Sequence, residues 1–149
     1  MNYFSKNFEF GSKAETLGNL SAVLSESVIP EFVHFNLREW KLSKKLVLEN
    51  INKMVKKGRN VIVRSSSLQE DGELFAQAGK FLSIPHISPL DKGSLSDSID
   101  RVFNSYCEDN NIANEKNQVL VQEMVTNVSM SGVVFTHVLS TGAPYYVIN

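Results

Sequence analysis

Residues 61–84, VIVRSSSLQEDGELFAQAGKFLSI, are the stretch around which the rest of the chain is best understood. The stretch opens with three β-branched apolar residues, which predict a short buried strand. This strand runs directly into Arg64 and the serines of residues 65–67. A cation at the end of a buried strand is costly unless an anion meets it, and serine hydroxyls in a turn suit phosphate oxygens. The pattern predicts a polyphosphate site, or else an arginine that pairs with Glu70 or Asp71 at the surface.

The composition is that of a folded domain in a reducing compartment. The chain has 149 residues, with 42% hydrophobic and 21% charged residues, which argues against global disorder. Its net charge of −1 provides no basic excess that would attract nucleic acid or an anionic membrane. No apolar run reaches the roughly 18 residues of a membrane span, and the N-terminus lacks an apolar signal core. Because the single cysteine, Cys107, excludes an internal disulfide, we expect a cytoplasmic protein.

Helices and strands follow one another along the chain, which predicts a mixed α and β fold with hairpin-like strands near the end. Helical spacing of apolar residues is found in residues 14–24, 42–55 and 94–107, and strand-like runs in residues 61–64, 80–84, 118–125 and 144–149. We expect Gly58 to cap the second helix and Ser94 or Ser96 to cap the third. The three histidines lie far apart, so no zinc site is predicted.

Lys13 stands at the start of the first predicted helix, directly after a glycine turn. Helix N-termini carry unpaired N–H groups and a partial positive charge, so a lysine there does not favour the helix. Its position makes sense if an anion is bound beside it. The alternative is an exposed lysine without a ligand.

Several motifs of this chain resemble one known family. VRSS, then ED, then AG in residues 61–84 resemble the signature of the N-terminal nucleotide-binding domain of the phosphoenolpyruvate synthase and pyruvate phosphate dikinase family. GSKAETLGNL in residues 11–20 is similar to the family's GGK opening, and VQEMV in residues 121–125 is similar to its VQKMV. SGVVFT in residues 131–136 also resembles a family segment. The motifs occur in the family's order from about residue 10 to residue 149.

The resemblance implies an α+β fold, namely an incomplete ATP-grasp-like nucleotide-binding domain. Residues 1–90 would form the phosphate-binding portion, residues 91–117 a helix and a loop, and residues 118–149 the strands of an adenine hinge. Lys13 and Arg64 are implied as the catalytic groups that neutralise the ATP phosphates. The other implied ligand contacts are Ser65, the backbone of Gly79, the Ser83 hydroxyl, Gln122, and the main chain of Glu123 and Val125, with the Met124 thioether against the adenine ring.

As function, the resemblance implies a phosphotransferase that passes a phosphoryl group from ATP, through a phosphohistidine on another domain, to a small-molecule acceptor. The magnesium ligands, a Gln-x-Arg pair and a C-terminal phosphohistidine domain are expected beyond residue 149, so these residues alone should be inactive. One alternative is a kinase of the same family that acts on an antibiotic, a sugar or an amino-acid amide. The other is a non-catalytic nucleotide-sensing or interaction module, because Ser12 replaces a family glycine and the family's acid-proline pair is missing after Thr136.

Overall fold

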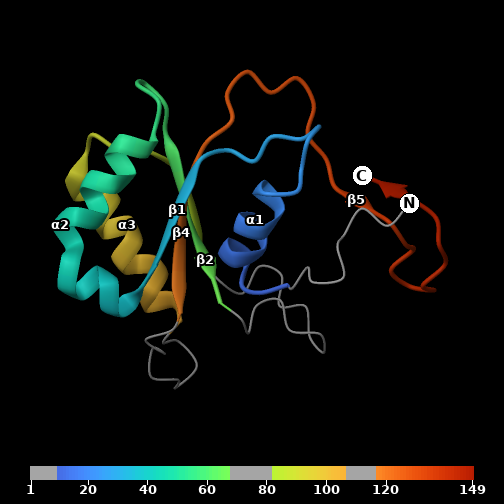
Figure 1. Cartoon of the computed structure of the whole chain (residues 1–149), viewed down its shortest axis with the longest axis horizontal. Helices are drawn as coiled ribbons and strands as arrows, with labels where there is room; N and C mark the ends of the chain where they lie inside the picture. The colour runs from blue at the N-terminus through green and yellow to red at the C-terminus, as the bar shows by residue number, and fades with distance from the viewer. Residues whose placement is uncertain (1–9, 68–81, 107–116) are drawn as a thin grey trace.

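The computed structural model describes residues 10–67, 82–106 and 117–149. The predictions that concern Gly79, residues 70–71 and Cys107 therefore lie outside the described residues. The described part is an α+β structure with three helices, a four-stranded antiparallel sheet and a separate two-stranded sheet (Figure 1). The predicted fold class is confirmed at this level.

The four-stranded sheet has the order β1-β4-β2-β3, and all of its pairings are antiparallel. Its strands are β1 (Phe32–Asn36), β2 (Val61–Ser66), β3 (Ser83–Ile87) and β4 (Gln118–Glu123). The two most apolar runs of the sequence, β2 and β4, occupy the centre of the sheet, where both neighbours shield them from water. The predicted strand at residues 61–64 is confirmed and continues through two of the serines.

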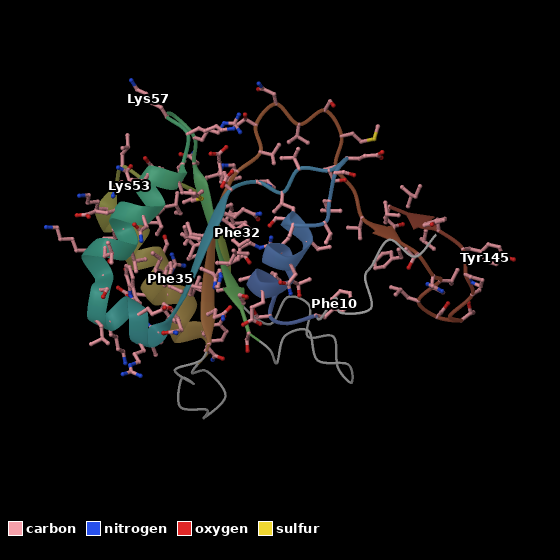
Figure 2. The ribbon with its side chains drawn as sticks, in the orientation of Figure 1. Phe10, Phe32, Phe35, Lys53, Lys57 and Tyr145 are labelled. Atoms are coloured by element: carbon pink, nitrogen blue, oxygen red, sulfur yellow. The ribbon has the colours of Figure 1, made fainter. Side chains whose placement is uncertain are left out.

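The two faces of the sheet differ. Helices α2 (Leu37–Met54) and α3 (Lys92–Ser105) pack on one face, and the shorter α1 (Lys13–Ser21) lies on the other (Figure 1). Figure 2 shows Phe35 on the side of the two long helices and Phe32 on the side of α1. The core lies between the sheet and the long helices and contains Phe35, Trp40, Val47, Ile51, Val61, Val63, Leu95, Ile99, Val102, Phe103, Tyr106, Val119 and Val121.

Helix α2 begins earlier than residue 42 because Asn36 caps it. The Asn36 side chain accepts a hydrogen bond from the Glu39 main-chain N–H at 2.9 Å, and the Glu39 carboxylate accepts one from the Asn36 main-chain N–H at 2.8 Å. At the other end the cap is Val55, so the prediction of a Gly58 cap is wrong. Gly58 instead supplies a positive φ of 81° to the turn that follows.

Two further boundaries differ from the prediction. Asp91, rather than Ser94 or Ser96, caps α3 by accepting from the Ser94 N–H at 3.1 Å. Strand β3 runs to Ile87, beyond residue 84, where the predicted strand ends. A backbone bulge makes this extension possible, since the β2–β3 register shifts between Val61 and Val63.

The end of the chain forms the second sheet, in which β5 (Val134–Phe135) pairs antiparallel with β6 (Val147–Ile148). The predicted hairpin-like strands are thus confirmed, although they are shorter than expected. Gly132 allows the two segments to meet, because a Cβ there would lie 2.4 Å from the Asn149 carbonyl oxygen. Among the described helices, none combines the length and the apolar character that crossing a membrane requires.

Candidate nucleotide-binding site

The start of α1 is anchored to the end of β2, and this brings Lys13 to the segment that carries Arg64. The Ala14 main-chain N–H donates to the Ser66 hydroxyl at 2.9 Å, and the Ser12 hydroxyl donates to the Gln118 side chain at 2.8 Å. With the helix held there, Lys13 Nζ lies 3.5 Å from the Ser65 carbonyl oxygen, which is a long and weak contact. Lys13 and the end of β2 therefore meet, although 52 positions of sequence separate Lys13 from Ser65.

Arg64 and Ser83 lie in one row across the sheet. Arg64 is directly opposite Ser83 on β3 and Leu120 on β4, and Leu120 is opposite His34 on β1. Directly opposed residues of antiparallel strands point to the same face. That face is the α1 face, because Ser66, two positions after Arg64, contacts α1. The structure thus places the predicted residues Arg64 and Ser83 on one surface next to α1.

Within the described residues, the Arg64 side chain contains a buried polar atom that has no partner. Its Nε atom is buried and makes no hydrogen bond to any described residue. A buried donor without an acceptor costs roughly 1–3 kcal/mol, and more if the group is charged. Such a cost is offset if a ligand oxygen accepts the bond. This atom is the feature of the described site that most directly indicates an anionic ligand.

The N-terminus of α1 is different, because the chain itself satisfies the N–H groups that we expected to face an anion. The Ala14 N–H is bonded to Ser66, and the Glu15 N–H reaches the Ser12 hydroxyl at 3.3 Å. Glu15 accepts from the Ser12 N–H at 2.8 Å, and this hydrogen bond is the main reason why the pKa of Glu15 is lowered. The expectation of open N–H groups is therefore wrong at Ala14 and Glu15, and a ligand here would depend on the Lys13 side chain.

Ser65 faces away from this surface. It is fully buried and lies opposite Val119, a core residue, so its side chain alternates with those of Arg64 and Ser66. Its main-chain carbonyl reaches Lys13. The Ser65 hydroxyl is positioned toward the core rather than beside Arg64.

The predicted adenine hinge, residues 122–125, is at the far end of β4. The Gln122 side chain donates to the Pro30 carbonyl at 3.3 Å, and the Glu123 N–H donates to the Glu31 carbonyl at 2.9 Å. The Glu123 N–H is therefore already bonded within the sheet. Val125 is 59% exposed, and no hydrogen bond among the described residues involves its main chain. The main chains of Glu123 and Val125 are the two predicted to bind adenine. Of these, the Val125 main chain is the one whose N–H makes no hydrogen bond among the described residues.

The Glu123 carboxylate is held on the opposite face by Arg59 and by the Lys56 main chain. It is only 5% exposed and accepts from Arg59 Nη1 and from the Lys56 main-chain N–H, both at 2.9 Å. Arg59 and Glu123 form an ion pair. The pair joins residues 64 positions apart, and no local sequence signal indicates it.

A hollow of about 530 Å³ lies between α1 and β1. Among the described residues that line it are Glu15 and His34, but no lysine or arginine. The carboxylate of Glu15 would repel a triphosphate. The hollow also lies on the β1 side of α1, whereas Arg64 is on β2. We therefore place the candidate phosphate site at Lys13, Arg64 and Ser83 rather than in this hollow.

Metal ions in proteins are held by sets of ligand side chains. In the part of the chain that the structure describes, no three or more His, Cys, Asp or Glu side chains are grouped so that they could hold a metal ion. The expectation that magnesium ligands lie beyond residue 149 remains a prediction.

The chain matches the model of a known protein family. The model of the family described as "Pyruvate phosphate dikinase, AMP/ATP-binding domain" matches residues 20–149. No curated protein and no solved structure matches the chain significantly. The matched range contains Arg64, Ser83 and the hinge, but it begins after Lys13, so the role of Lys13 depends on the resemblance of its motif and on the geometry of α1.

Proposed function

Because this chain belongs to the family of the AMP/ATP-binding domain of pyruvate phosphate dikinase, we propose that it is the ATP-binding portion of a phosphotransferase of this kind. In this proposal a phosphoryl group passes from ATP to a histidine on another domain and from there to a small-molecule acceptor. The described residues have no part in that transfer other than to bind and orient the nucleotide and to neutralise its charge.

The observation that carries the proposal is the buried Nε atom of Arg64, which has no hydrogen-bond partner among the described residues. A phosphate oxygen is an acceptor of the right charge, and a guanidinium bonds such oxygens in a fixed planar geometry. The Lys13 amine adds a second positive charge from the start of α1, and the Ser83 hydroxyl supplies a donor in the same row as Arg64. Gly79, the fourth predicted phosphate contact, lies outside the described residues.

For the nucleotide base, the proposal relies on the end of β4. The Val125 main chain has an N–H and a carbonyl that could pair with the ring acceptor and the amino group of adenine. The Gln122 side chain contributes by donating to the carbonyl of Pro30, which holds the segment before β1 in place. This arrangement would put the base near β4 and the phosphates near the start of α1.

Calorimetric titration with Mg-ATP tests the proposal. We expect Arg64→Ala to weaken ATP binding by about 10-fold to 100-fold, the range for loss of a hydrogen bond to a charged group. Arg64→Lys should restore only part of the affinity, because lysine lacks the planar pair of donors. Arg38→Ala is the control, since Arg38 is an exposed arginine on α2, on the other side of the sheet. Unchanged ATP binding by Arg64→Ala would remove Arg64 from the site.

A non-catalytic module is the second candidate. It is favoured by the Glu123 N–H and the first N–H groups of α1, which are bonded within the chain instead of being open to a ligand. Measurement of phosphoryl transfer by the complete protein separates the two candidates. Transfer that Arg64→Ala abolishes supports the enzyme, whereas ATP binding without any transfer supports the module.

A further inference from the structure

His86 has a main-chain conformation that side-chain-bearing residues rarely adopt. Its φ of 62° lies in the left-handed region, and Asn127 is the other non-glycine residue of the described chain with a positive φ. The conformation costs of the order of 1 kcal/mol for a residue with a Cβ, and glycine would avoid most of this cost. A histidine rather than a glycine occupies this position, so the left-handed conformation is kept at a cost in stability.

The bulge in β3 determines the side of the sheet on which His86 lies. On β2, Val61 pairs with Ile87 and Val63 with Ile84, so β3 contains one more residue than β2 between the two pairs. In a regular strand, side chains three positions apart point to opposite faces. Here Ile84 and Ile87 both pack against the core. The extra residue therefore leaves Pro85 and His86 together on the side away from the core, which is the side of Arg64 and Ser83.

A specific contact joins His86 to the predicted base site. The His86 main-chain N–H donates to the Met124 Sδ atom at 3.2 Å, across 38 positions of sequence. The Met124 N–H continues the β2–β4 ladder by donating to the Asn60 carbonyl at 2.9 Å. Alternation along β4 puts the Met124 side chain on the same face as that of Gln122. The thioether is thus held on the α1 face, one residue before the open main chain of Val125.

We propose that His86 is a positioning residue of the nucleotide site, which holds the Met124 thioether against the purine base. This inference rests on the proposed function, because it assumes that the base binds at the end of β4. A methionine side chain is flexible and contacts aromatic rings well through its sulfur atom. A main-chain donor that fixes the sulfur orders the Met124 side chain before the base binds. Base binding then costs less side-chain conformational entropy. The left-handed conformation of His86 aims that donor.

A purely structural bulge makes a different prediction. If the bulge served only to keep two isoleucines in the core, glycine at position 86 would relieve strain and leave ligand binding unchanged. If His86 positions Met124, glycine at position 86 would keep the N–H group. It would also let the main chain leave the conformation that directs this N–H toward the Met124 sulfur. The two cases therefore differ in binding and not only in stability.

The experiment measures the Kd of Mg-ATP and of inorganic tripolyphosphate, which has no base, for the wild-type chain and its variants. We expect Met124→Leu and His86→Gly each to weaken ATP binding by about threefold to tenfold while tripolyphosphate binding stays the same. His86→Gly should do so with an unchanged or higher Tm. His86→Asn should retain most of the ATP affinity, since asparagine tolerates the left-handed region.

Two matched controls complete the design. Asn127→Gly relieves the other positive φ, and Met130→Leu alters a methionine that is 90% exposed, so neither should alter the ratio of the two Kd values. If the wild-type chain binds neither ATP nor tripolyphosphate, the proposed function itself fails and this inference fails with it. If it binds both and His86→Gly and Met124→Leu keep the wild-type ratio, the proposed function stands and the positioning role is overturned.

Discussion

The Ser66 hydroxyl accepts a hydrogen bond from the Ala14 main-chain N–H at 2.9 Å, and this bond attaches the first helix to the strand that carries Arg64. The bond is buried, and its two residues are 52 positions apart. One serine of the VRSS motif thus helps to hold Lys13 in place.

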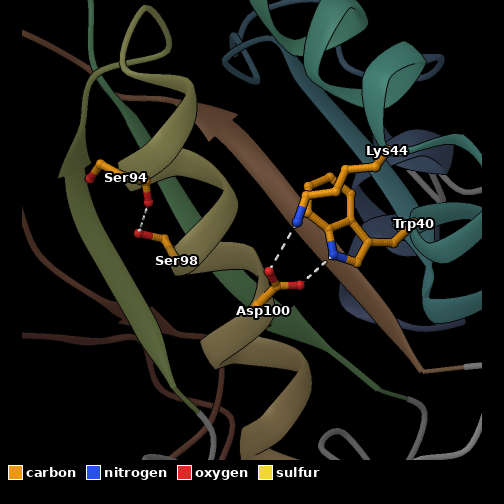
Figure 3. Close-up of polar contacts among 5 residues, drawn as sticks. All are labelled: Trp40, Lys44, Ser94, Ser98 and Asp100. Carbon is orange, nitrogen blue, oxygen red and sulfur yellow. Dashed lines mark hydrogen bonds and ion pairs between the residues drawn. The ribbon is translucent and has the colours of Figure 1, made fainter.

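Ser66→Ala should lower the free energy of unfolding by about 1–3 kcal/mol, because it leaves the buried Ala14 N–H without an acceptor. Urea denaturation followed by circular dichroism measures the change. Ser98→Ala is a matched control: Ser98 is also buried, but its hydroxyl donates to the Ser94 carbonyl of its own helix (Figure 3). A loss no larger for Ser66→Ala than for Ser98→Ala would contradict the anchoring role.

Asp100 joins α2 to α3 through two donors (Figure 3). It accepts from Trp40 Nε1 at 2.6 Å and from Lys44 Nζ at 3.1 Å, while the Lys44 amine lies 4.7 Å from the centre of the Trp40 ring. Trp40 is 3% exposed, so Asp100→Ala should cost about 1–3 kcal/mol of stability by stranding the indole N–H. Asp100→Asn keeps an acceptor and should cost clearly less.

Lys44→Ala serves as the comparison for that cluster. Both partners of the Lys44–Asp100 pair are nearly half exposed, so its loss should change stability by less than about 1 kcal/mol. A loss as large as that of Asp100→Ala would mean that the ion pair, and not the Trp40 hydrogen bond, joins the helices.

Arg59→Ala should destabilise the protein by about 1–3 kcal/mol, because it leaves the buried Glu123 carboxylate with the Lys56 N–H as its remaining donor. The partial exposure of the Arg59 side chain limits the loss of stability. Lys53→Ala, in the exposed last turn of α2, is the control for removing a positive charge. A double-mutant cycle with Glu123→Gln isolates the pair. Additive losses in that cycle would show that the two side chains are not coupled.

Glu15 makes stability depend on pH in the acidic range. Its pKa is lowered from 4.5, mainly by the hydrogen bond from the Ser12 N–H, with smaller contributions from Gln118 and the Ser12 side chain. A lowered folded-state pKa means that the stabilisation is complete above the unfolded-state pKa and is lost as the pH falls through the folded-state value.

Glu15→Gln keeps a capping-box side chain but cannot titrate. We therefore expect the stability difference between wild type and Glu15→Gln to be constant from about pH 7 to about pH 5.5 and to shrink below the ordinary glutamate range. Urea midpoints measured across this range check the prediction. A difference that grows as the pH falls would have the wrong sign for a lowered pKa.

Much of the fold could be predicted from local patterns. The apolar run at residues 61–63 became the buried start of β2, and the predicted helices and strands are present with shifted ends. The helix ends differ from the predicted ones because capping side chains set them. Asn36 caps the start of α2 at an earlier residue than predicted, and Asp91 caps the start of α3. A cap depends on one side chain meeting one N–H group, which periodicity does not report.

The sequence by itself determined the α+β class, the family and the segments that supply Lys13 and Arg64. Only the tertiary structure decided which polar groups already have partners: Arg59 is paired with Glu123, whereas Arg64 Nε has no partner among the described residues. The physical reason is that strand order and register bring together residues that are far apart in sequence. One position along β2 puts Ser65 in the core and Ser66 against α1, and a single extra residue in β3 puts His86 beside Met124.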